Sequence, residues 1–145
     1  MSQVIQSVLV THSAQQMFDL VDRVEDYPAF LPWCGGVELK ESTPEVTEAR
    51  ININFHGVKA HFHTRNAKLP NHMVISLVDG PFRRFEGEWV FTPLGEDACK
   101  VELRLSWEFS TKLLEKVIGP VFSRIASTFV QGFEKRADEV YGSGL

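Results

Sequence analysis

Cysteine is scarce in this sequence of 145 residues, and long apolar runs are missing. Cys34 and Cys99 are its only cysteines and have no CxxC spacing, which argues against a zinc site or a redox motif of that kind. No stretch approaches the run of about 20 apolar residues that spans a membrane. Residues 1–6 have neither the basic start nor the apolar run of a secretion signal. We therefore expect a cytoplasmic protein that contacts membranes only peripherally, at the inner face.

Positive charge is also in short supply. The net charge is −4, the sequence pI is about 5.7, and the longest basic feature is the pair Arg83-Arg84. A protein that holds nucleic acid through its phosphates normally carries clustered lysine and arginine. Direct DNA binding is not expected, and direct RNA binding is disfavoured.

Catalytic motifs are absent as well. The sequence contains no G-x-S-x-G, H-E-x-x-H or glycine-rich phosphate loop. Cys34 is a conceivable nucleophile, but cysteines of this kind usually just pack in the core. Strand alternation places Glu86, Glu88, Glu102 and Glu108 on outward faces. We expect no catalytic residue and no required cofactor.

One histidine pair invites a metal interpretation. His61 and His63 are two residues apart on a predicted strand and therefore share a face with Lys59 and Arg65. Zinc sites use three or four ligands, and no further ligand lies near in the sequence. We expect no metal site.

Aromatic residues are what the sequence has in plenty. It contains 11 Phe and three Trp against two Tyr, within a hydrophobic fraction of 43%. Phe and Trp bring large apolar area with little polar surface, so they suit either a thick core or the wall of an apolar ligand site. Both roles remain open at this stage.

The N-terminal part predicts a strand, a short helix and an unusual connector. Residues 4–10 are aliphatic and β-branched and predict a strand. Ser13 and Gln16 have the spacing of a capping box, so a helix begins there and continues to Asp26-Tyr27-Pro28. Residues 27–34 are apolar and contain two prolines, which predicts a stiff connector that is neither a long helix nor a central strand.

The middle of the chain predicts antiparallel strands. Apolar residues occupy odd positions over 49–55 and even positions over 58–62, on either side of His56-Gly57. A two-residue hairpin turn produces this switch, because Phe55 and Val58 then face each other. Residues 73–78, 85–91 and 101–109 predict further strands, the last two with one apolar face.

The C-terminal part predicts a long helix that covers the sheet. Ser110 or Thr111 can cap it, and Gly119-Pro120 must interrupt or kink it. The apolar residues repeat at intervals of three and four and form one broad stripe: Val117, Ile118, Val121, Phe122, Ile125, Phe129, Val130, Phe133, Ala137, Val140 and Tyr141. We therefore predict a single α+β domain over residues 1–145, in which a curved antiparallel sheet of about six to seven strands wraps around this helix and leaves a hollow lined by aromatic residues.

Several motifs, in this order, resemble one protein family. They are residues 27–34 (YPAFLPWC), Thr64-Arg65-Asn66, residues 79–82 (DGPF) followed by Gly87-x-Trp89-x-Phe91, and Phe133-x-x-Arg136-Ala137. Together they span nearly the whole chain and are similar to the coenzyme Q-binding and ribosome-association toxin (RatA) family, within the START-like, helix-grip superfamily of polyketide cyclases and dehydrases.

The resemblance implies a fold and three alternative functions. The first is binding of ubiquinone, a polyisoprenoid quinone, in the hollow in support of respiration. The second is the role of some bacterial members, which associate with the large ribosomal subunit and inhibit translation by blocking subunit joining. The third, a cyclase-like enzyme, needs an acid–base pair that faces inward, and the sequence shows none.

The predicted ligand-binding residues are apolar and come from three places. Phe30, Leu31 and Trp33 lie on the connector at the expected mouth of the hollow, and the others lie on inward strand positions or on the facing helix. The latter are Phe55, Phe62, Phe82, Trp89, Phe91, Trp107, Phe122, Phe129 and Phe133.

Overall fold

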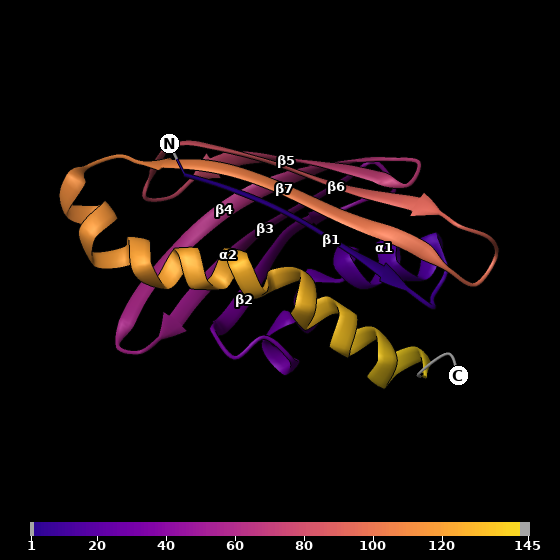
Figure 1. The fold of residues 1–145 in the computed structure, drawn as a ribbon. Coiled ribbons are helices and arrows are strands. Elements are labelled where there is room, and N and C mark those ends of the chain that lie inside the picture. Colours follow the sequence, from indigo (N-terminus) through magenta and orange to yellow (C-terminus); the bar gives the residue numbers. More distant parts are fainter. Residues whose placement is uncertain (1, 143–145) are drawn as a thin grey trace.

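The computed structural model describes residues 2–142, so residue 1 and residues 143–145 of the predicted domain lie outside the described part. Seven antiparallel strands form one sheet in the order β1-β7-β6-β5-β4-β3-β2, which confirms the predicted fold class. The sheet curves around the long helix α2, which crosses its concave side (Figure 1). In chain order the elements are β1 (Ser2–Val10), α1 (Ala14–Asp22), the 3₁₀ helix η1 (Val24–Ala29), β2 (Cys34–Ser42), β3 (Val46–Phe55), β4 (Val58–Leu69), β5 (His72–Asp79), β6 (Phe82–Pro93), β7 (Cys99–Phe109) and α2 (Lys112–Tyr141).

The β3–β4 hairpin confirms the change of parity in the sequence. Phe55 pairs with Val58 across the two-residue turn. His56 and Gly57 have φ angles of 50° and 78°, in the left-handed region that a type I′ turn requires. The apolar faces of both strands therefore point to the concave side, where Ile51, Ile53 and Phe62 are buried.

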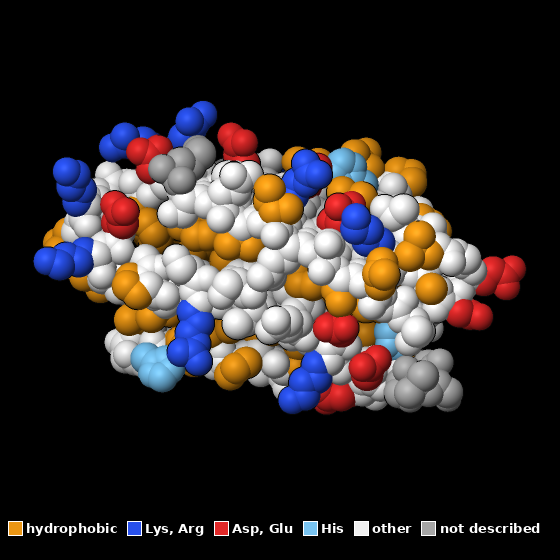
Figure 2. Space-filling model, in the orientation of Figure 1, with side chains coloured by type: hydrophobic (Ala, Val, Ile, Leu, Met, Phe, Trp, Pro, Cys, Tyr) orange, Lys and Arg blue, Asp and Glu red, His pale blue; other side chains and the backbone are white. Residues whose placement is uncertain are grey.

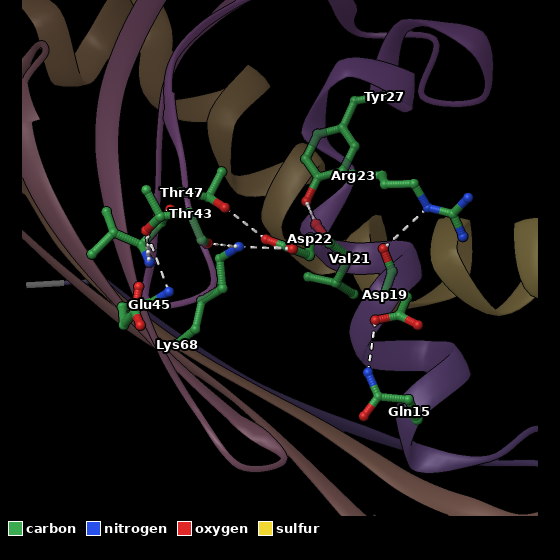
Figure 3. Close-up of polar contacts among 11 residues, drawn as sticks. Gln15, Asp19, Val21, Asp22, Arg23, Tyr27, Thr43, Glu45, Thr47 and Lys68 are labelled. Atoms are coloured by element: carbon green, nitrogen blue, oxygen red, sulfur yellow. Dashed lines mark hydrogen bonds and ion pairs between the residues drawn. The ribbon is translucent and has the colours of Figure 1, made fainter.

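The first helix ends earlier than predicted. The capping box forms, since Gln16 N donates to Ser13 Oγ and Ser13 N donates to Gln16 Oε1. However, α1 stops at Asp22, and residues 24–29 form a 3₁₀ helix that contains Pro28. The boundary is set by tertiary contacts, because the Asp22 carboxylate bonds to side chains of the sheet (Figure 3).

Helix α2 begins where Thr111 caps it, with Leu114 N donating to Thr111 Oγ1. Pro120 lies inside the helix without interrupting it, and Figure 1 shows the first turns running at an angle to the rest. The predicted apolar stripe of α2 is buried only in its middle part, and residues near both of its ends are exposed. Val117 and Val140 are 54% and 45% exposed, because the first turns bend away from the sheet and the last turn extends beyond it.

The buried face of α2 carries a row of aromatic rings. Phe122 packs against Phe82 and Trp107, with ring centroids 5.0 Å away in each case. Further along, Phe133 packs against Tyr27 and Trp89 at 5.2 Å and 5.4 Å. The predicted aromatic hollow is therefore largely filled by side chains, and a small cavity is left between them.

Candidate functional site: a cavity and a groove on either side of Phe129

A small cavity of about 50 Å³ lies between the sheet and α2. Ligand sites for drug-sized molecules usually measure about 300–1,000 Å³, so this space is too small for a substituted ring unless side chains move. None of the described residues that line it is charged. They are Val24, Tyr27, Ile51, Phe62, Thr64, Asn66, Ile75, Phe85, Trp89, Leu103, Leu105, Phe122, Ile125, Ala126 and Phe129.

The polar side chains of this cavity come from η1 and β4. The Tyr27 hydroxyl donates to Val21 O at 2.6 Å, and burial, with a contribution from nearby Asp22, raises the pKa of Tyr27 well above its usual value. Thr64 and Asn66 are 5% and 8% exposed. Within residues 2–142, the Asn66 Oδ1 atom is buried and has no hydrogen-bond partner.

An open groove of about 360 Å³ lies on the other side of α2, beside the connector. Phe30, Leu31, Trp33 and Phe55 form its apolar wall. Arg124 lies at its edge, with the guanidinium 5.9 Å from the centre of the Phe55 ring. The remaining lining residues are Pro32, Ile125, Thr128, Gln131, Gly132 and Lys135.

Phe129 and Ile125 separate the cavity from the groove. Ile125 lines both spaces. The Phe129 ring lies 5.8 Å from Trp89, inside the cavity, and 5.6 Å from Trp33, which lines the groove. Phe129 is also the only aromatic ring of the described cavity lining that is not buried. Phe129 therefore packs between a residue of the cavity and a residue of the groove, next to the shared Ile125.

The twelve predicted ligand-binding residues divide into three groups of four. Phe62, Trp89, Phe122 and Phe129 line the cavity, whereas Phe30, Leu31, Trp33 and Phe55 line the groove. Phe82, Phe91, Trp107 and Phe133 are buried and line neither space. Ligand contact by any of them stays a prediction.

Thr64 and Asn66 stood out in the sequence only as parts of a family motif and were not predicted as site residues. Thr64 and Asn66 continue the inward positions of β4 that begin with Val58, Ala60 and Phe62. The same alternation that predicted the hairpin therefore also predicts that Thr64 and Asn66 face inward. Because both side chains are polar, they were not counted with the apolar inward residues.

A polar cluster next to the cavity holds α1 on the sheet (Figure 3). The Asp22 carboxylate accepts hydrogen bonds from Thr47 Oγ1 at 2.7 Å and from Lys68 Nζ at 2.9 Å. Lys68 also donates to Thr43 O at 2.7 Å, and its side chain is only 7% exposed. The acid and the base of this cluster are bonded to each other, so it fixes the end of α1 rather than forming an acid–base pair in the cavity.

Replacing Lys68 with methionine is expected to destabilise the fold. The change leaves the Asp22 charge without its partner and should lower the free energy of unfolding by about 2–3 kcal/mol, less than for a fully buried pair because Asp22 retains some solvent contact. Urea unfolding measures the change. Lys40→Met is the control, because the Lys40–Glu38 pair is exposed and 4.0 Å long. Equal effects of the two substitutions would contradict a structural role for the cluster.

The histidine pair on β4 belongs to ion pairs on the outer face. His63 Nε2 lies 2.8 Å from the Glu48 carboxylate, and Arg65 Nη1 lies 2.9 Å from it. The hydrogen bond from Arg65, and then that with His63, lowers the pKa of Glu48. Among the residues that the structure describes, no group of three or more side chains is arranged to hold a metal ion.

Both cysteines are free and buried. Burial raises the pKa of the Cys34 and Cys99 thiols, which lowers the fraction of reactive thiolate at neutral pH. We expect Ellman's reagent at pH 7.5 to modify the native protein at least about tenfold more slowly than the urea-unfolded protein. Rapid modification of one thiol in the native state would contradict this expectation and reopen Cys34 as a nucleophile.

Comparison with known proteins places the chain in a family. Residues 10–134 match the family described as polyketide cyclase/dehydrase and lipid transport, so the chain belongs to that family. Among its relatives, the ribosome association toxin RatA of Vibrio cholerae is 46% identical over 143 residues, covering 98% of this chain and 99% of the relative. RatA of Escherichia coli is 43% identical over 144 residues, covering 99% and 91%.

A more distant relative is a coenzyme Q-binding protein, the other kind of protein that the sequence motifs resemble. The mitochondrial coenzyme Q-binding protein COQ10 homolog B of Xenopus laevis is 30% identical over 142 residues, which cover 94% of this chain and 58% of that longer protein. The resemblance inferred from the sequence motifs is therefore confirmed.

Solved structures support the fold. An 18 kDa protein of Caulobacter crescentus is 28% identical and superposes with a TM-score of 0.73, covering 98% of this chain and 99% of that one. A Streptomyces aromatase/cyclase reaches a TM-score of 0.78 at 15% identity, over 99% of both chains, which shows a shared fold alone. No described helix is long and apolar enough to cross a membrane.

Proposed function

We propose that this protein binds a lipophilic ligand between the sheet and α2, and that the ligand is a polyisoprenoid quinone such as ubiquinone. The observation that carries the proposal is an uncharged inner cavity beside a groove with an apolar wall. Ile125 lines both spaces, and Phe129 packs between Trp89 of the cavity and Trp33 of the groove. A ligand with a compact ring and a long apolar tail matches this arrangement, with the ring in the cavity and the tail in the groove.

Binding in this proposal requires the cavity to widen. Phe129 turns away from Trp89, the ring takes the vacated space, and the tail passes Ile125 towards Trp33 and Phe55. The driving force is removal of the tail from water at about 25 cal/mol per Å² of apolar surface, which amounts to about 2–3 kcal/mol for an isoprene unit of about 100 Å². The protein would thus sequester the ligand rather than transform it.

The absence of charge in the described cavity lining supports binding over catalysis. A cyclase-like reaction needs an acid and a base close to the substrate, and the polar side chains here are Tyr27, Thr64 and Asn66. The raised pKa of Tyr27 keeps its hydroxyl protonated, so it is a poor base. We propose a non-enzymatic protein that works in the cytoplasm and meets its ligand at the inner face of the membrane.

Tryptophan fluorescence tests quinone binding directly. Trp89 lines the cavity and Trp33 lines the groove, so a short-chain ubiquinone bound as proposed quenches both. We expect saturable quenching with one site per chain. In Trp33→Phe, most of the quenching that arises from the tail in the groove should be lost, while quenching of Trp89 remains. Quenching that stays linear, as for free tryptophan in solution, would contradict the proposal.

Ribosome association is the second candidate, favoured by the names of the bacterial relatives and by one surface feature. Lysine and arginine side chains crowd the end of the molecule where α2 begins (Figure 2). Arg83, Arg84, Lys112 and Lys116 are all exposed there, and Ser110 N bonds to Pro81 O to hold the two segments together. Arg83 pairs with Glu108 at 3.4 Å and Glu115 lies in the first turn of α2, so this end keeps an excess of basic side chains although the whole chain carries a net charge of −4.

Co-sedimentation with purified large ribosomal subunits tests this candidate. We expect salt-sensitive binding that the double substitution Arg84→Glu, Lys116→Glu reduces, while Lys40→Glu on β2 leaves it unchanged. Absence of the protein from the subunit pellet at low salt would remove the candidate.

A further inference from the structure

Asn66 occupies a position where a polar group is costly. Its side chain lies on the inward face of β4, 8% exposed, among the apolar residues of the cavity. Its amide oxygen is buried and has no bonding partner within the described part of the chain. Burying an amide group without a hydrogen bond lowers the stability of the fold. An unpaired buried amide therefore suggests a functional role for the residue rather than a structural one.

The neighbouring polar groups do not supply the missing partner. The Tyr27 hydroxyl donates its proton to Val21 O, so it has none left for Asn66. Thr47, which pairs with Asn66 across β3 and β4, donates its hydroxyl proton to Asp22. The hydroxyls of Tyr27 and Thr47 are thus already committed to other acceptors, and the described residues leave the Asn66 oxygen free to accept a hydrogen bond from a ligand.

We propose that Asn66 binds the polar ring of the ligand and is the residue that selects a ring-bearing lipid over a plain hydrocarbon. This inference rests on the proposed function, because it assigns the ring to the cavity and the tail to the groove. The atom without a partner is the amide oxygen, which accepts, so the hydroxyl of a quinol supplies the donor that it lacks. The NH₂ group of the same side chain can donate to a quinone carbonyl, so the oxidised form is held through the other end of the amide.

The arrangement also fixes the direction of the ligand. Asn66 lines the cavity and not the groove, whereas the groove wall carries Phe30, Leu31, Trp33 and Phe55. A ring bonded to Asn66 therefore leaves its tail one way out, past Phe129. A lipid without a polar ring gains nothing from Asn66 and is held by apolar contact alone.

The test compares two ligands and two variants. Asn66→Leu keeps the branching and the number of heavy atoms of the side chain and removes its polarity. We expect it to weaken binding of short-chain ubiquinone by about three- to tenfold, the value of one hydrogen bond, and to leave binding of squalene, a ring-free polyisoprenoid, unchanged. Asn54→Leu, the same substitution at an exposed position of β3 that lines neither the cavity nor the groove, should leave the ratio of the two affinities as in the wild type.

Stability provides a second readout that a merely structural role would not give. Because the buried amide oxygen has no partner in the free protein, Asn66→Leu is expected to raise the unfolding midpoint in urea while it lowers affinity for the quinone. Unchanged preference for ubiquinone over squalene in Asn66→Leu would overturn the inference and leave the proposed function standing. Failure of the wild type to bind either ligand would overturn both.

Discussion

Arginine in place of Phe129 is expected to abolish ligand binding. The substitution puts a charge between the cavity and the groove, where a bound ring and tail would surround it, and burying an unpaired charge costs several kcal/mol. The expected loss is about a hundredfold or more in affinity for a short-chain ubiquinone. Because Phe129 is half-buried, the arginine can reach solvent in the free protein, so the domain still folds.

Two further variants make this result interpretable. Ser123→Arg adds the same charge to an exposed position of α2 that lines neither space, and it should bind as the wild type does. Phe129→Trp adds bulk without charge and should also weaken binding by filling the passage. Circular dichroism confirms folding of each variant. Folded Phe129→Arg protein with wild-type affinity would show that the ligand does not pass between the two spaces.

Truncation of Phe133 is the substitution expected to affect stability most. Its ring is fully buried and packs against Tyr27, Phe30, Trp89 and Phe129 at centroid distances of 5.2, 5.3, 5.4 and 5.2 Å. Phe133→Ala creates a cavity and removes these ring contacts, three of them edge-on, which should cost about 3–5 kcal/mol. In a domain of this size, that corresponds to a fall of about 10 °C or more in the melting temperature.

The control lies on the same helix. Leu113 is 70% exposed in the first turn of α2, so Leu113→Ala should change the free energy of unfolding by less than about 0.5 kcal/mol. Urea denaturation at equilibrium measures both variants. Similar losses for Phe133→Ala and Leu113→Ala would mean that α2 is not anchored to the sheet through its aromatic face.

The fold was largely predictable because its elements are defined by local patterns. The parity switch around His56-Gly57 fixed the register of the β3–β4 hairpin, and strict alternation over residues 101–109 gave the buried face of β7. Local patterns did not predict the boundaries of elements that are set by contacts between residues far apart in the sequence. Asp22 ends α1 through bonds to Lys68, 46 positions away, and no periodicity signals such a pair.

The candidate site was predictable only in part. The high content of Phe and Trp indicated an apolar hollow, and eight of the twelve predicted residues line the cavity or the groove. Hydrophobicity could not tell a packed ring such as Phe91 from one that borders a cavity, because both are inward and apolar. It also passed over Asn66, since a polar residue at an inward position stands out only once its surroundings are known.

The two functions suggested by the relatives use different parts of the molecule. The proposed quinone binding would use the inside, between the sheet and α2, whereas ribosome contact would use the basic end around Arg84 and Lys116. Substitutions at Phe129 and Asn66 should therefore affect quinone binding alone, and substitutions at the basic end should affect ribosome binding alone. A protein that carries both activities would lose each of them independently.

Organic extraction of the freshly purified protein, followed by mass spectrometry of the extract, tests the central claim most directly. The proposal predicts a prenylated quinone in an amount close to one per chain from the wild type, and none from Phe129→Arg. A wild-type protein that yields no lipid, and that also fails to take up added ubiquinone, would contradict the claim. The space between the sheet and α2 would then be a packed core, and the basic end of the molecule would become the functional surface to pursue.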